Sequence, residues 1–186
     1  RAVTPSSPED GGARHTTGVA APLGASRFLV VGLGVTGRAM VAALRARGFD
    51  VVAVDDRADP ATVTELSRDL GIEVDGAPDD RRLASLVSSV EVVLPSPGIP
   101  DGHAAFALAA AAGVAIASEF DLASAWDDRP RLAVTGTNGK TTVCEMTAAM
   151  LVASGIRAVT VGNTETPLVA AIDDASVDVF VVEASS

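Results

Sequence analysis

The sequence has few aromatic residues, one cysteine and little positive charge. Aromatics make up 3% of the 186 residues and tyrosine is absent, so the core must be built from alanine, valine, leucine and isoleucine. The single Cys144 cannot form an internal disulfide, which is typical of a reducing cytoplasm. Lysine and arginine total 14 against 24 acidic residues, a formal charge of −10. Because nucleic acid needs a basic surface, this composition argues against it as a partner.

Long apolar runs are also missing. No run approaches the roughly 18–20 residues of a membrane span, and no signal peptide is visible. We therefore expect a cytoplasmic protein without membrane insertion, and a monomer. The chain begins at Arg1 rather than at a methionine and stops at Ser186 just after an apolar run, so we expect it to be a piece of a longer protein.

The pattern of apolar and turn residues predicts three parts. Residues 1–26 are rich in small and turn-forming residues without periodicity, which predicts a disordered tail. From residue 27 onward, short apolar runs alternate with segments of helical periodicity, which is typical of βαβ units and a mostly parallel sheet. A second series begins near Ser118. We predict one α/β domain over 27–118 and an unfinished one over 119–186.

The individual elements follow from apolar runs, helix caps and helix-ending glycines. The apolar runs predict strands at 27–32, 50–56, 91–96, 114–118, 131–136, 157–162 and 178–184. The helical spacing predicts helices at 36–48, 59–71, 103–113, 118–126, 140–155 and 166–174.

A glycine cluster follows the first predicted strand. Gly32, Gly34 and Gly37 form G-x-G-x-x-G between the run 27–32 and the helix 36–48. Such glycines permit a tight turn, close approach of a phosphate, and close packing of helix on sheet. The helix start offers free N–H groups and a positive dipole end to an anion. By itself this suggests a nicotinamide or flavin dinucleotide site, although a plain strand-to-helix turn would use the same glycines.

Two more features lie where the ligand of that turn would be. Asp55 ends the second strand, where its carboxylate can accept hydrogen bonds from a ribose or a base. The run SPGIP (96–100) follows the strand 91–96, so Ser96 and Gly98 would face the same ligand at the carboxyl ends of the strands. Taken alone, this run is better explained as a rigid proline-rich loop.

The most specific pattern is TGTNGKTT at 135–142. Gly136 and Gly139 let backbone N–H groups converge on phosphate oxygens. Lys140 supplies a positive charge for the β- and γ-phosphates, and the Thr141 hydroxyl is the usual protein ligand of a nucleotide-bound Mg²⁺. The predicted ATP-binding loop comprises Gly136, Thr137, Asn138, Gly139, Lys140, Thr141 and Thr142.

This loop departs from the common formula G-x-x-x-x-G-K-[ST], because Val134 stands where the first glycine is expected. Every chemical part is nevertheless present. Glu183 ends the last predicted strand, and in P-loop folds an acid at the tip of a neighbouring strand completes the magnesium shell. A strand-end glutamate alone would be a solvated surface charge; beside a phosphate loop, we predict a metal ligand.

Other polar and aromatic residues have plainer explanations. His103 is expected to begin a helix, Trp126 to pack at the domain junction, and Cys144 to be buried on the helix after the loop. The paired acids 55–56, 79–80, 127–128 and 173–174 fall at element ends, where solvated charges are common.

Together these motifs resemble a known family. TGTNGKTT is similar to the ATP loop of the Mur ligases and of the related folylpolyglutamate synthetases. VVGLGVTGRA (30–39), DDR (55–57) and SPGIP (96–100) are similar to the branch of the Mur ligases that adds D-glutamate to UDP-N-acetylmuramoyl-L-alanine. Gly162-Asn163 and the final VVEASS resemble its central domain. The resemblance covers about residues 27–186.

The resemblance implies a Rossmann-like parallel-sheet nucleotide-binding domain followed by an incomplete P-loop α/β ATPase domain. The front domain would bind the UDP substrate rather than NAD. Val35 and Thr36 would meet the diphosphate, and Asp55 and Arg57 the base end. The implied UDP-substrate site comprises Gly34, Val35, Thr36, Gly37, Asp55, Arg57, Ser96, Pro97 and Gly98.

In the central domain, the resemblance implies a catalytic set of Lys140, Asn163 and Glu183, with Thr141 and Glu183 on Mg²⁺. The implied reaction is ATP-dependent: the substrate carboxylate becomes an acyl phosphate, which the amine of D-glutamate converts to an amide. The family's later histidine, its modified lysine and its C-terminal domain would lie beyond Ser186. We therefore expect no ligation by this chain alone.

Two residues depart from the family pattern: Ala184 stands where a leucine is frequent, and Asp56 replaces a hydroxyl residue and adds an anion near the nucleotide. Three alternatives stay open. Another Mur or folylpolyglutamate-type ligase would show a different glycine turn. A dinucleotide-dependent oxidoreductase would leave Lys140 and Thr141 unexplained. The third is a nucleotide-binding module without catalysis.

Overall fold

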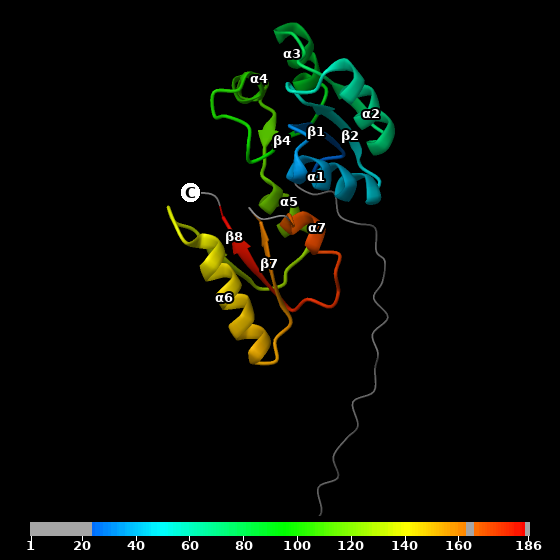
Figure 1. Ribbon diagram of the computed structural model, residues 1–186. Helices are drawn as coiled ribbons and strands as arrows, with labels where there is room; N and C mark the ends of the chain where they lie inside the picture. The colour runs from blue at the N-terminus through cyan, green and yellow to red at the C-terminus, as the bar shows by residue number, and fades with distance from the viewer. Residues whose placement is uncertain (1–23, 163–165, 185–186) are drawn as a thin grey trace, which may run out of the picture.

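The computed structural model describes residues 24–162 and 166–184 (Figure 1). Nearly all of the predicted tail at 1–26, and the predicted catalytic Asn163, lie outside the described residues. The described part contains two parallel β-sheets, each with helices beside it. None of the helices in this part is long and apolar enough to cross a membrane.

The first sheet has five parallel strands in the order β3-β2-β1-β4-β5. Its strands are β1 (Arg27–Val31), β2 (Asp50–Val54), β3 (Glu73–Asp75), β4 (Val92–Pro95) and β5 (Ala115–Ile116). The chain builds outward from β1 to β3, then returns to the other side of β1 with β4. The strand order thus reverses between β1 and β4, and at such a switch point the loops leaving the two strands open a crevice for a ligand.

Helices cover both faces of this sheet, because alternate side chains of a strand point to opposite faces. On one face, Phe28 and Val30 pack in a core with α1 (Val35–Ala46), and α2 (Pro60–Leu70) packs at its edge. On the other face, Leu29 and Val31 pack with α3 (Asp80–Ser88) and α4 (Ala104–Ala112). These three layers confirm the predicted α/β class with a mostly parallel sheet.

The sequence patterns did not predict β3 and α3. Only Val74 of β3 is buried, so the strand has no apolar run to reveal it. Helix α3 begins with DRR and buries Leu83, Leu86 and Val87 on one side. Asp79, expected to be a solvated charge, is its N-cap and accepts a hydrogen bond from the Arg82 N–H at 2.7 Å.

The second sheet has three parallel strands in the order β6-β8-β7. Its elements are α5 (Glu119–Trp126), β6 (Arg131–Val134), α6 (Lys140–Ala153), β7 (Ala158–Gly162), α7 (Leu168–Ala171) and β8 (Val179–Glu183). The helix predicted over 166–174 is shorter than expected. Pro167 precedes its first turn, and Arg129 binds the carbonyl oxygens of Ile172, Asp174 and Val177, which holds the following segment in a loop.

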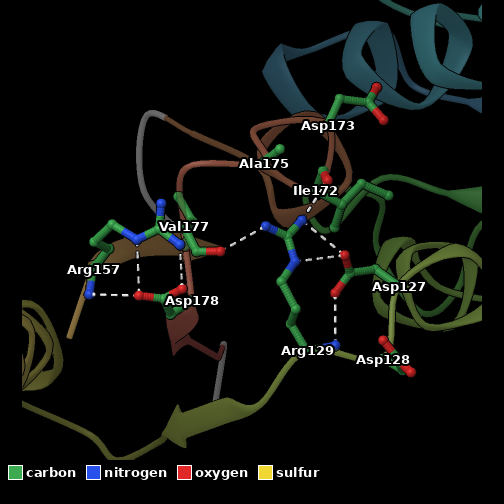
Figure 2. Close-up of a pocket in the computed structure, with 9 residues that line it drawn as sticks. All are labelled: Asp127, Asp128, Arg129, Arg157, Ile172, Asp173, Ala175, Val177 and Asp178. Atoms are coloured by element: carbon green, nitrogen blue, oxygen red, sulfur yellow. Dashed lines mark hydrogen bonds and ion pairs between the residues drawn. The ribbon is translucent and has the colours of Figure 1, made fainter. Parts of the chain in front are cut away.

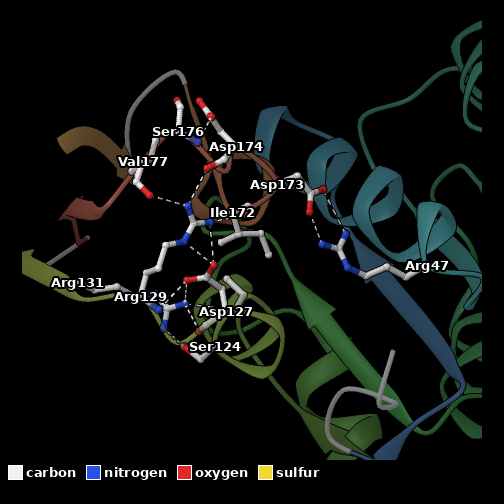
Figure 3. Close-up of polar contacts among 11 residues, drawn as sticks. Arg47, Ser124, Asp127, Arg129, Arg131, Ile172, Asp173, Asp174, Ser176 and Val177 are labelled. Atoms are coloured by element: carbon white, nitrogen blue, oxygen red, sulfur yellow. Dashed lines mark hydrogen bonds and ion pairs between the residues drawn. The ribbon is translucent and has the colours of Figure 1, made fainter. Parts of the chain in front are cut away.

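The two sheets are joined by a shared core around α5 and α7, which lie between them in Figure 1. Trp126 stacks on Phe49 with ring centroids 6.1 Å apart, and the Arg47 guanidinium lies 4.2 Å from the indole centroid. Arg47 also pairs with Asp173 (Figure 3). The prediction that Trp126 packs at the domain junction is confirmed.

Candidate functional site

The first glycine turn connects β1 to α1 at the strand-order reversal. Gly32 has φ +87°, a backbone conformation that favours glycine, and its N–H donates to the Val54 carbonyl at 2.7 Å. A Cβ on Gly37 would lie 1.9 Å from the Gly32 carbonyl oxygen. Helix α1 therefore packs against the turn as closely as the glycine spacing predicts.

The loop after β4 lies against this turn. The Ser96 hydroxyl donates to the Gly32 carbonyl at 2.6 Å, and the Ser96 N–H donates to the Val31 carbonyl at 2.9 Å. Ser96 is only 9% exposed, so its side chain braces the turn. The run 96–100 therefore lies against the glycine turn, where the sequence placed it if Ser96 and Gly98 were to face the ligand of that turn.

Asp55 closes the turn from the β2 side. One carboxylate oxygen accepts from the Leu33 N–H at 2.8 Å and the other from the Arg57 N–H at 3.0 Å. Both oxygens thus already hold backbone donors of the protein. The carboxylate predicted to face a ribose or a base has, in addition, a structural role that the sequence did not reveal.

These loops enclose a cavity of about 490 Å³. Eight of the nine predicted UDP-site residues line it; Gly37 does not and instead packs beneath the turn. The N-terminus of α1 opens into the cavity with no side-chain cap and no acid in its first turn. Free N–H groups and a positive dipole end make such a terminus suitable for a phosphate.

Asp56 and His103 also line this cavity, although neither was among the predicted UDP-site residues. His103 was expected only to begin a helix, which it does as the N-cap of α4. Its Nε2 also lies 2.9 Å from an Asp56 carboxylate oxygen. No local sequence pattern predicts this pair, because the two residues are 47 positions apart in the chain.

The second glycine loop connects β6 to α6. Gly136 and Gly139 have φ of +149° and +76°, so both occupy backbone regions that favour glycine. Gly139 is the N-cap of α6, which has no side-chain cap and no acid in its first turn. The Lys140 ammonium donates to the Gly136 carbonyl at 2.7 Å. The lysine thus lies against the loop, in front of an uncapped helix N-terminus. That this loop binds phosphate stays a prediction.

The predicted metal ligands also come together. The Thr141 hydroxyl donates to a Glu183 carboxylate oxygen at 2.7 Å. Strand register explains this proximity, since Glu183 of the central β8 is paired with Val134 on one side and Gly162 on the other. A hydroxyl and a carboxylate are the hard oxygen donors that Mg²⁺ prefers, so these two residues fit that ion. Within the described ranges, no group of three or more His, Cys, Asp or Glu side chains could hold a metal.

Cys144 lies one turn further along α6. Its thiol is fully buried, as predicted, and burial together with the nearby Glu183 and Glu145 carboxylates raises its pKa. A thiol kept neutral in this way is a poor nucleophile. Cys144 therefore has the character of a packing residue of α6.

A further cavity of about 550 Å³ lies at the other end of the second sheet, before β6, β7 and β8 begin (Figure 2). Arg129 and Arg157 line it, but both guanidinium groups are engaged. Arg129 contacts Asp127 and three carbonyl oxygens, and Arg157 pairs with Asp178. Since ligands of parallel sheets bind at the carboxyl ends of the strands, this cavity is the weaker candidate.

Fold and sites together define a class: an α/β protein with two parallel sheets, each with a glycine-rich turn between a strand and a helix. A family model described as "Mur ligase MurD-like, N-terminal domain" matches residues 26–118, and one described as "Mur ligase middle domain" matches residues 134–186. The chain belongs to the Mur ligase family.

Curated relatives point to one branch of that family. A UDP-N-acetylmuramoylalanine–D-glutamate ligase of Frankia casuarinae is 43% identical over 77% of this chain and 30% of its own length. The protein with that name from Mycolicibacterium smegmatis is 39% identical over 91% of this chain and 35% of its own length. The chain thus spans about a third of the length of the curated relatives it matches.

Solved structures support the fold. The UDP-N-acetylmuramate:L-alanyl-gamma-D-glutamyl-meso-diaminopimelate ligase of Neisseria meningitides has a TM-score of 0.51 and 23% identity, over 86% of this chain and 52% of that one. A murein peptide ligase of Psychrobacter arcticus has a TM-score of 0.50 and 23% identity, over 86% and 37%. At this identity the likeness concerns the fold alone.

Proposed function

We propose that this chain carries the two nucleotide sites of an ATP-dependent ligase that adds D-glutamate to UDP-N-acetylmuramoyl-L-alanine in peptidoglycan precursor synthesis. The observation that carries the proposal is the pairing of two different phosphate turns on one shared core. One opens into the cavity at β1 and β4, and the other carries Lys140, Thr141 and Glu183. A ligase of this kind must hold a nucleotide-linked substrate and ATP at once.

The front cavity would bind the UDP end of the substrate. The uncapped N-terminus of α1, at Val35 and Thr36, would receive the diphosphate, since its free N–H groups have no other partner in a helix. The nucleoside would then lie along the wall formed by residues 55–57 and 96–98. The relatives' printed name, which includes a UDP-linked substrate, supports this assignment.

The second loop would bind ATP with Mg²⁺. Lys140 would exchange its bond to the Gly136 carbonyl for the β- and γ-phosphates, and Thr141 and Glu183 would hold the metal. When bound, Mg²⁺ neutralises charge on the phosphates. The role of Asn163 in the reaction stays a prediction, as does the domain division at residue 118.

The proposed reaction has two steps. A carboxylate oxygen of the substrate attacks the γ-phosphorus, the bond to ADP breaks, and an acyl phosphate forms. The amine of D-glutamate then attacks the acyl carbon, loses a proton, and phosphate leaves. Because two anions must meet in the first step, the part of this chain is placement and neutralisation of charge, with Lys140 supplying one positive charge.

We also propose a cytoplasmic location. The single cysteine is free and buried, and the described residues contain no helix suited to a membrane span. The free cysteine accords with a reducing compartment, where ATP and nucleotide-linked sugars are available.

Calorimetric titration of the chain with UDP-N-acetylmuramoyl-L-alanine and, separately, with NADH tests the front site. We expect saturable binding of the UDP compound and none of NADH. Binding of NADH without binding of the UDP compound would favour a dinucleotide-dependent oxidoreductase and reject the ligase assignment.

A further inference from the structure

His103 and Asp56 face each other at the front cavity, and neither belongs to the predicted site. The His103 Nε2 lies 2.9 Å from an Asp56 carboxylate oxygen. The other ring nitrogen, Nδ1, accepts a hydrogen bond from the Ala105 N–H at 3.1 Å, so it carries no proton. In the neutral ring the proton therefore resides on Nε2 and is donated to Asp56. The first turn of α4 thus orients the His103 ring, and the ring in turn orients the Asp56 carboxylate.

The two neighbouring acids differ in what they offer to a ligand. Both oxygens of Asp55 accept backbone N–H groups, from Leu33 and Arg57. Asp56 gives one oxygen to His103, while its other oxygen has no partner among the residues that the structure describes. The Asp56 side chain is 50% exposed, whereas that of His103 is 11% exposed. Among the described residues, Asp56 is thus the one of these two acids with a carboxylate oxygen that no protein donor contacts.

We propose that Asp56, oriented by His103, is the specificity-determining acceptor of the front cavity and receives a hydrogen bond from the nucleoside end of the ligand. The inference rests on the proposed function and assigns to Asp56 the part that the family resemblance gave to Asp55. Asp55 instead holds the glycine turn. His103 is a positioning residue, since it acts through Asp56.

The negative charge of Asp56 limits which part of a ligand can lie beside it. An ionised carboxylate accepts hydrogen bonds but cannot donate them, and it repels a phosphate. The diphosphate is therefore expected at the N-terminus of α1, and the group beside Asp56 must carry an N–H or O–H. In a uridine nucleotide these donors are the imide N–H of the base and the hydroxyls of the ribose. The shared chemistry is a neutral donor of the nucleoside.

Three probes separate the two sources of that donor: UDP, its 3-methyluracil analogue, which lacks the imide N–H, and its 2′-deoxy analogue. We expect the wild-type chain to bind one of the two analogues at least about tenfold more weakly than UDP, as for the loss of a hydrogen bond to a charged group. In Asp56→Ala, UDP is expected to bind about as weakly as that analogue does, and the difference between the two should vanish.

His103→Asn provides the matched variant for the positioning role. Asparagine is a good N-cap and keeps an acceptor for the Ala105 N–H, but it is too short to replace Nε2 beside Asp56. We expect an unchanged unfolding midpoint and severalfold weaker UDP binding. We also expect a smaller ratio between the affinity for UDP and the affinity for the analogue that wild type binds more weakly. A purely structural role of His103 would leave that ratio unchanged.

The outcomes distinguish this inference from the proposed function. If the wild-type chain binds UDP but Asp56→Ala binds it equally well, or keeps the same discrimination, the role of Asp56 is overturned and the UDP site stands. If both analogues bind to wild type as UDP does, the role is likewise overturned. If wild type binds no UDP at all, both the inference and the front-site assignment fail.

Discussion

The Thr141 hydroxyl donates to the Glu183 carboxylate at 2.7 Å and so joins the first turn of α6 to the end of β8. Glu183 is only 5% exposed and ends the central strand β8, paired with Val134 of β6 on one side and Gly162 of β7 on the other. A buried carboxylate beside a hydroxyl, next to a lysine-bearing loop, is an arrangement suited to a metal-bound phosphate.

Replacement of Glu183 by glutamine should therefore act through magnesium. Glutamine keeps the size of the side chain and an acceptor for the Thr141 hydroxyl, but it lacks the charge that a divalent cation requires. We expect ATP binding in the presence of Mg²⁺ to weaken at least about tenfold, while binding without Mg²⁺ stays the same. Titration with and without the ion measures this, and Glu145→Gln on the exposed side of α6 is the control.

The glycine turn allows a matched pair of substitutions. A Cβ on Gly37 would lie 1.9 Å from the Gly32 carbonyl oxygen, whereas one on Gly34 meets nothing within 4 Å. We expect Gly37→Ala to lower the free energy of unfolding by about 1–3 kcal/mol, the usual cost of overpacking. Gly34→Ala should change it by less than about 0.5 kcal/mol. Urea unfolding compares them, and equal losses would contradict the packing role of Gly37.

Arg129 and Arg157 line the same cavity but bind different groups (Figure 2). Arg129 is largely buried and binds Asp127 and three carbonyl oxygens, so Arg129→Ala leaves several groups unpaired. We expect a loss of about 3 kcal/mol or more in the free energy of unfolding. Arg157→Ala, which removes an exposed pair, should lower the unfolding midpoint far less. Equal losses of stability in the two variants would contradict the structural role of Arg129.

Glu119 should make stability depend on pH. Its carboxylate is buried and accepts from the Val169 N–H at 2.8 Å, but loss of solvation dominates and raises its pKa above the ordinary value. The folded state then binds more protons than the unfolded state between the two pKa values, so stability falls as pH rises through that window. Glu119→Gln should flatten this decline. Parallel stability curves for wild type and variant, measured from about pH 4 upward, would contradict the assignment.

Much of the fold could be predicted from the sequence, because the elements beside both glycine turns combine apolar runs with turn residues. The run 27–32 and the glycines after it predicted β1, the turn and the start of α1. By contrast, β3 and α3 depend on few buried side chains and on Arg82, which pairs with Glu73 and Asp75. Pairings of that kind follow from tertiary structure, and a local pattern does not reveal them.

The sites show the same division. The sequence singled out Lys140, Thr141 and the loop glycines because these residues are adjacent in the chain. The roles of Asp55 and Asp56 were not, because they depend on which backbone N–H or imidazole each carboxylate meets across the sheet. Spacing places a residue at a strand end; only the packed structure decides whether its acceptors are taken.

The most direct test is calorimetric titration of the chain with Mg-ATP, in wild type and in Lys140→Ala. We predict saturable binding to a single site in wild type and at least about tenfold weaker binding in the variant, because one positive charge beside the phosphates is lost. Absence of Mg-ATP binding by wild type, or equal affinity of the two proteins, would contradict the account.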